Sequence, residues 1–110
     1  MRYVDRLLEN ELHAPHLLDV ECAQALRRMT LAGAATNERA SQALDMLKDL
    51  ALVRHGHAKL LKRIWELRSS ISAYDAAYIA LSEALDTPLL TCDGKLSRSH
   101  GHGAKILLLT

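Results

Sequence analysis

Three carboxylates interrupt apolar segments of a chain of 110 residues. Glu21 lies in the run "LLDVECAQAL", Asp75 in the first turn of the apolar segment "SAYDAAYIAL", and Asp93 ends the short apolar segment "TPLLTCD". Carboxylate oxygens are the ligands that Mg²⁺ and Mn²⁺ prefer. A cation held in this way neutralises the charge of a phosphodiester and activates water. The three residues together therefore indicate a divalent-cation site.

Each carboxylate also has a purely structural interpretation. Asp75 can serve the dipole of its helix, and Glu21 can be an exposed helix residue. Asp93 can form a turn with the glycine that follows it. Taken one at a time, none of the three decides between the two interpretations. Four other aspartates are interpreted as solvated: Asp19, Asp45, Asp49 and Asp86.

The hydrophobic pattern predicts helices first and short strands later in the chain. Thr36 or Asn37 is expected to cap one helix and Gly33 to end another. Residues 13–16 are expected to break the chain, with Pro15 biasing Ala14 towards an extended conformation. The strands do not alternate between apolar and polar residues, which favours a sheet buried on both faces in a layered α/β fold. The expected helices are 2–9, 17–32, 36–51, 57–70 and 72–86, and the expected strands are 52–55, 87–93 and 104–109.

The overall composition points to one small cytoplasmic domain that spans residues 1–110. The net charge is +1, so the overall charge gives no indication of nucleic-acid binding. Cys22 and Cys92 fit no ligand spacing and are interpreted as small hydrophobic residues in a reducing compartment. No stretch approaches the length of a membrane span, and the N-terminus lacks the apolar core of a secretory signal.

Two long motifs resemble the PIN-domain family, and more narrowly the VapC-type toxins of bacterial toxin–antitoxin pairs. They are "APHLLDVECAQALRR" (14–28) and "SAYDAAYIALSEALDTPLLTCDGKL" (72–96), and the closing "AKILLL" adds to them. The resemblance covers nearly the whole chain. It implies a three-layer α/β/α domain with a mostly parallel sheet.

The same resemblance implies a metal-dependent endoribonuclease that cleaves RNA phosphodiesters. Glu21, Asp75 and Asp93 match the acidic residues that bind Mg²⁺ or Mn²⁺ in the family, and Thr91 matches a hydroxyl position beside that site. Members are commonly homodimers, and a VapB-type antitoxin inserts its C-terminal segment across the active site. Basic residues near the proposed site are candidates for RNA phosphate contact: Lys95, Arg98 and Arg27.

The chain departs from the family pattern at its N-terminus. The family opens with a central strand that ends in Asp, and we expect roughly 15 to 20 residues of this region to be missing here, because an α/β sheet needs that strand. Alternatively, "RYVD" is a shortened first strand and Asp5 is the missing acid. A chain without the strand is expected to be unstable or repaired by dimer contacts, with weak or absent catalysis.

Two other functions stay open at this stage. One is a catalytically inactive PIN remnant that acts only as a binding or dimerisation module. The other is an unrelated helical interaction module, which requires that 87–93 and 104–109 do not pair as strands.

A few further side chains could take part in binding. Two His-Gly-His pairs, at 55–57 and 100–102, could bind Zn²⁺ if they met in space. Trp65 is expected in the core or a dimer interface rather than under an RNA base. Three more arginines are candidates for phosphate contact: Arg28, Arg54 and Arg68.

Overall fold

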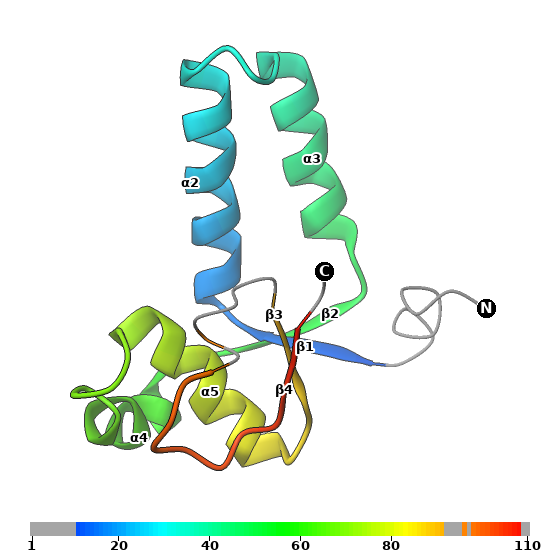
Figure 1. Ribbon diagram of the computed structural model, residues 1–110. Coiled ribbons are helices and arrows are strands. Elements are labelled where there is room, and N and C mark those ends of the chain that lie inside the picture. The colour runs from blue at the N-terminus through cyan, green and yellow to red at the C-terminus, as the bar shows by residue number, and fades with distance from the viewer. Residues whose placement is uncertain (1–10, 92–95, 97, 109–110) are drawn as a thin grey trace. The chain divides into compact units, whose positions relative to one another are not determined.

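The computed structural model describes residues 11–91, 96 and 98–108 of the chain (Figure 1). The chain divides into two compact units, Met1–His55 and Gly56–Thr110, and each is described by itself. The predicted helix 2–9 and Asp5 lie outside the described residues, as do Cys92, Asp93 and Lys95.

The first unit is a helical hairpin inserted between two paired strands (Figure 1). Its strands run parallel, with Leu12 opposite Leu52 and Pro15 opposite His55. Gly33 follows the first helix with a φ of +75°, a conformation that glycine adopts without strain. The elements in chain order are β1 (Leu12–Pro15), α2 (Leu17–Leu31), α3 (Asn37–Asp49) and β2 (Leu52–His55).

The second unit packs two helices and a pair of parallel strands around a small apolar core. Ala76 and Ile79 of its longer helix are fully buried, and they pack with Leu67 and Leu96. The strand pairing places Leu89 opposite Ile106, and both residues pack against this core. The elements are the 3₁₀ turn η1 (Ala58–Leu60), α4 (Leu61–Glu66), α5 (Ala73–Leu85), β3 (Leu89–Thr91) and β4 (Ile106–Leu108).

The mixed α/β class with parallel strands is confirmed. All three strands that the sequence predicts are present as β2, β3 and β4. Because β3 pairs with β4, the interpretation as an unrelated helical module is wrong. The described residues form two sheets of two strands each, one in each unit. Among these residues, none of the helices combines the length and apolar character needed to cross a membrane.

Two predictions of local structure are wrong. Residues 13–16 do not simply break the chain, because β1 occupies most of that segment and Pro15 ends it. The missing N–H of Pro15 is tolerated there, and the next residue, His16, donates its backbone N–H to the carbonyl of His55 at 2.8 Å. The single helix expected over 57–70 is a 3₁₀ turn followed by the short helix α4 and further turns.

Candidate functional site

Asp75 occupies the first turn of α5, as the sequence predicts. Ser72 has extended backbone angles and caps the helix, because its Oγ accepts the backbone N–H of Asp75 at 3.1 Å. The side chain of Asp75 is half-buried, and the next residue, Ala76, is fully buried. The helix dipole favours a carboxylate at this end. The cap was not anticipated, although the spacing Ser-x-x-Asp is a signal that could have found it.

Glu21 lies in α2 of the first unit and is exposed. Its neighbour in the helix, Cys22, is half-buried, and burial raises the pKa of that thiol, helped by the charges of Asp19 and Glu21. Cys22 is therefore a protonated, partly covered thiol at neutral pH rather than a thiolate ligand.

Asp19 is not the solvated residue that the sequence suggests. Its Oδ2 accepts the Nε–H of Arg54 at 2.7 Å, while its Oδ1 is buried and has no hydrogen-bond partner among the described residues. Arg54 also donates from Nη2 to the carbonyl of Leu47 at 2.9 Å. The guanidinium of Arg54 thus joins β2 to both helices of the hairpin, and its contact with phosphate stays a prediction.

Thr91 ends β3 and is half-buried, opposite Leu108 in the neighbouring strand. The chain reverses between α5 and β3 through Asp86, which adopts a left-handed conformation with φ of 49°. Helix and strand contact each other, so β3 runs back along α5 towards the end that carries Asp75. Asp93 follows Thr91 by two residues but lies outside the described residues.

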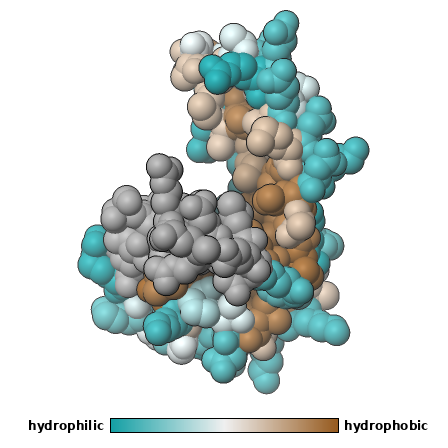
Figure 2. Space-filling model, turned by 90° about the vertical axis from the view of Figure 1, so that its right-hand side faces the viewer, coloured by the Kyte–Doolittle hydropathy of each residue, from teal (hydrophilic) through white to brown (hydrophobic). Residues whose placement is uncertain are grey.

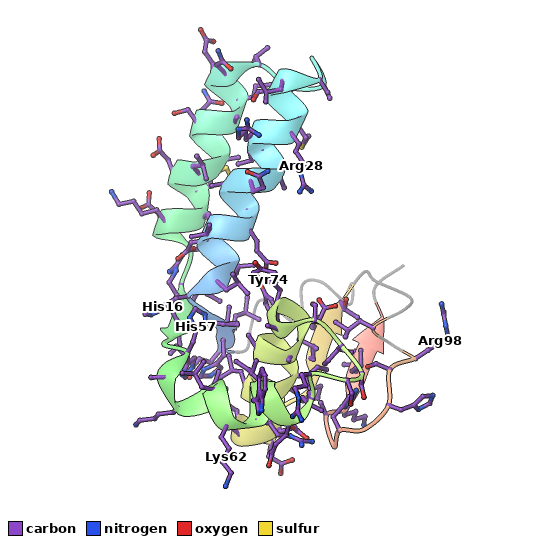
Figure 3. All side chains as sticks on the ribbon, turned by 90° about the vertical axis from the view of Figure 1, so that its left-hand side faces the viewer. His16, Arg28, His57, Lys62, Tyr74 and Arg98 are labelled. Atoms are coloured by element: carbon purple, nitrogen blue, oxygen red, sulfur yellow. The ribbon has the colours of Figure 1, made fainter. Side chains whose placement is uncertain are left out.

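The arginines proposed to contact RNA phosphate differ in their contacts within the chain. Arg27 is exposed on α2, and Arg98 is exposed on the loop before β4, where Figure 3 shows it pointing away from the chain. The guanidinium of Arg68 lies 4.6 Å from the centre of the Trp65 ring. Trp65 is 67% exposed, so of the two predicted positions the core is excluded and the dimer interface stays a prediction.

Two histidines of the His-Gly-His pairs have partners within their own units. His102 accepts the backbone N–H of Ala104 at Nδ1 and contacts Ser99 Oγ at 2.7 Å through Nε2, so both ring nitrogens are used within its own loop. His55 instead faces His13, with 2.8 Å between Nε2 and Nδ1. Across residues 11–91, 96 and 98–108, no three or more His, Cys, Asp or Glu side chains converge as a metal site.

Comparison with known proteins agrees with the motifs. A profile of the PIN domain family matches residues 1–100, and the chain belongs to the PIN-domain family. Its relatives include Ribonuclease VapC1 of Mycobacterium tuberculosis, which is 43% identical over 104 residues, covering 94% of this chain and 78% of the relative. Ribonuclease VapC9 of the same species is 47% identical over 89 residues, 78% of this chain and 68% of the relative. Ribonuclease VapC12 is 36% identical over 104 residues, 94% of this chain and 81% of the relative.

Proposed function

We propose that this protein is a cytoplasmic endoribonuclease of the VapC type that acts as the toxin of a toxin–antitoxin pair. The observation that carries the proposal is the 43% identity to Ribonuclease VapC1, which extends over 94% of the chain and therefore over both units. The family match over residues 1–100 also supports the proposal that the two units are parts of one PIN-like domain.

We further propose that Glu21, Asp75 and Asp93 hold the Mg²⁺ or Mn²⁺ ion that the family implies. The donor set fits such a cation, because it consists of hard carboxylate oxygens. The helix terminus that carries Asp75 suits an ionised carboxylate, and β3 runs back towards that end before the chain reaches Asp93. When bound, the cation would neutralise phosphate charge and activate a water molecule for hydrolysis.

The remaining residues have positioning roles in this proposal. Ser72 fixes the backbone of the first turn of α5, which limits the positions that the Asp75 carboxylate can take. The hydroxyl of Thr91 lies at the end of the strand that leads to Asp93. Arg27, Lys95 and Arg98 would contact RNA phosphates, which orient the substrate without reading its sequence.

The partners proposed are a VapB-type antitoxin and a second copy of the chain. Figure 2 shows a band of hydrophobic surface along the helical hairpin of the first unit. Large apolar side chains are exposed on the two helices of this hairpin, among them Val20 on α2 at 69% and Met46 on α3 at 74%. Extended apolar surface of this kind marks interaction sites more often than free surface. The band supports a protein partner on the hairpin.

The test measures cleavage of a fluorogenic RNA by the purified chain with Mg²⁺, with Mn²⁺ and with a chelator. We expect cation-dependent cleavage that Asp75→Asn abolishes and that Glu21→Gln weakens by raising the Mg²⁺ concentration required. Asp45→Asn, which changes an exposed carboxylate on α3, is the matched control and should cleave like the unsubstituted chain. If no RNA is cleaved with either cation, the proposed enzyme is rejected. That outcome favours the alternative, an inactive binding or dimerisation module.

A further inference from the structure

Two histidines from adjacent strands of the first unit point ring nitrogens at each other. His13 of β1 and His55 of β2 are separated by 2.8 Å between Nδ1 and Nε2, with ring centres 5.1 Å apart and planes inclined by 31°. The parallel register places His55 opposite Pro15, two residues after His13 on the same face of β1, so the two side chains meet diagonally across the sheet.

The far side of the His13 ring is held by a carboxylate. Nε2 of His13 lies 2.8 Å from Oε1 of Glu11, so that nitrogen carries the proton and the lone pair of a neutral His13 ring is on Nδ1. A carboxylate on the second nitrogen is the arrangement that fixes tautomer and ring direction for histidines that bind metals. In the metal-free chain, the Nε2–H of a neutral His55 ring donates to this lone pair.

The surroundings of the pair suit a cation. The side chain of His13 is only 22% exposed, and that of Glu11 adds a negative charge next to it. Alternation along β2 places the neighbouring cation, Arg54, on the opposite face, where Asp19 neutralises it. The backbone N–H of His16 donates to the carbonyl of His55 at 2.8 Å, which extends the contact between the strands beyond the pair.

We propose that His13 and His55 form a binding site for a borderline divalent cation such as Zn²⁺ or Ni²⁺. Imidazole nitrogens suit these ions, whereas Mg²⁺ and Mn²⁺ prefer oxygen. Two nitrogens bound to one tetrahedral Zn²⁺ lie about 3.3 Å apart, so the pair would open by about 0.5 Å and both rings would turn until their lone pairs converge on the ion. On binding, His55 moves its proton from Nε2 to Nδ1 by exchange with solvent, and both lone pairs then face the ion.

This site differs from the one proposed for catalysis. It uses none of the acidic residues assigned to Mg²⁺ or Mn²⁺, and it does not need the two His-Gly-His pairs to meet. Water would complete the coordination, because no three His, Cys, Asp or Glu side chains converge among the described residues. The ion would tie β1 to β2, the strands that flank the helical hairpin, and so stabilise the first unit.

The test titrates Zn²⁺ into the full chain after chelator treatment and follows heat of binding and Tm. We expect one Zn²⁺ per chain and a rise in Tm of about 4 °C or more at saturation. His13→Gln and His55→Gln should each weaken binding by at least about tenfold, and Glu11→Gln should weaken it by about 10- to 100-fold through loss of the outer carboxylate. His100→Gln, in an exposed loop of the other unit, is the matched control and should bind normally.

Asp75→Asn separates the two proposals, because it should lose RNA cleavage and keep Zn²⁺ binding. Unchanged binding in both His13→Gln and His55→Gln would overturn the proposal, and so would loss of binding in His100→Gln. Zinc X-ray absorption on the unsubstituted chain identifies the atoms bound to the ion. This measurement does not depend on whether the variants fold. Imidazole nitrogens at about 2.0 Å support the site, and a shell without imidazole overturns it.

Discussion

The hydroxyl of Ser72 accepts the backbone N–H of Asp75 at 3.1 Å and thereby caps the helix that carries this carboxylate. One bond thus connects the stability of α5 with the position of a proposed cation ligand. Ser72 therefore supplies one of the hydrogen-bond acceptors that the first turn of α5 needs.

The cap predicts a combined effect on stability and activity. Ser72→Ala should lower the free energy of unfolding by about 1 kcal/mol, because the first-turn N–H loses its acceptor. It should also lower kcat/KM for RNA by about tenfold or more, because the carboxylate loses its fixed position. Chemical denaturation and the fluorogenic RNA assay measure the two effects.

Thr36→Ala is the control for this prediction. Thr36 caps α3 through the backbone N–H of Arg39 at 3.2 Å, so its loss should destabilise the chain by a similar amount. Its cleavage rate, measured where the chain is fully folded, should stay unchanged. Ser72→Asn should restore both properties of the Ser72 cap, and an inactive but stable Ser72→Asn chain would contradict the positioning role.

The core of the second unit is expected to depend on Ile79. Its side chain is fully buried between Leu67, Ala76 and Leu96. Ile79→Ala should lower the free energy of unfolding by about 2 to 5 kcal/mol, and Ile79→Val by about 1 kcal/mol. Val20→Ala, at a position 69% exposed, should change it by less than about 0.5 kcal/mol. Urea titration followed by circular dichroism measures all three, and equal losses at Ile79 and Val20 would contradict this core.

A bidentate ion pair makes the stability of the second unit depend on pH. Arg63 donates from Nε and Nη2 to the two carboxylate oxygens of Glu83 at 2.8 and 3.0 Å, and the backbone N–H of Gly103 donates to Oε2 at 2.8 Å. Hydrogen bonding from Arg63 is the main cause that lowers the pKa of Glu83 below its usual value. Helix α4, helix α5 and the loop before β4 are therefore joined through one carboxylate.

The direction of the pH effect follows from this shift. The folded-state pKa is lower than the unfolded one, so the stabilisation is complete above the usual glutamate pKa of about 4.3 and is lost as pH falls through the folded value. Glu83→Gln should lower Tm at neutral pH, and its deficit should shrink as the pH drops below about 4. Glu66→Gln is the control, because Glu66 lies 3.5 Å from Arg63 and is half exposed. A Glu83→Gln deficit that does not change with pH would contradict this assignment.

Local signals in the sequence predict most of the elements. The caps and apolar spacing locate α2, α3 and α5, and β-branched or unbroken apolar runs locate β2, β3 and β4. The strand β1 is missed because its histidine and proline look like a chain break, and its pairing partner β2 comes 40 residues later in the register. The expected helix over 57–70 is too long because apolar spacing continues through Leu67, where turn hydrogen bonds replace the helix.

The candidate site is predicted only in part, because the signals in the sequence are local. A helix terminus is a local feature, so the place of Asp75 is read correctly from its neighbours. The ion pair of Asp19 with Arg54 and the contact of His13 with His55 join residues 35 and 42 positions apart, and no local pattern shows them. Charged and titratable residues therefore have to be assigned from contacts across the fold rather than from spacing.

Asp19 and Glu21 are two residues apart in α2 and should respond to substitution in opposite ways. Asp19→Asn weakens the ion pair with Arg54 that joins α2 to β2, so it should lower Tm and leave the Mg²⁺ dependence of RNA cleavage unchanged. Glu21→Gln changes an exposed side chain, so it should lower Tm less than Asp19→Asn does. Loss of a side chain that only orients a metal ligand costs about 10- to 100-fold in metal affinity. Because Glu21 is proposed to bind the cation directly, Glu21→Gln should lower the affinity for Mg²⁺ by at least that much. Mg²⁺ titrations of cleavage, run beside thermal melts of the same preparations, measure both, and a normal Mg²⁺ requirement in Glu21→Gln would remove Glu21 from the proposed site.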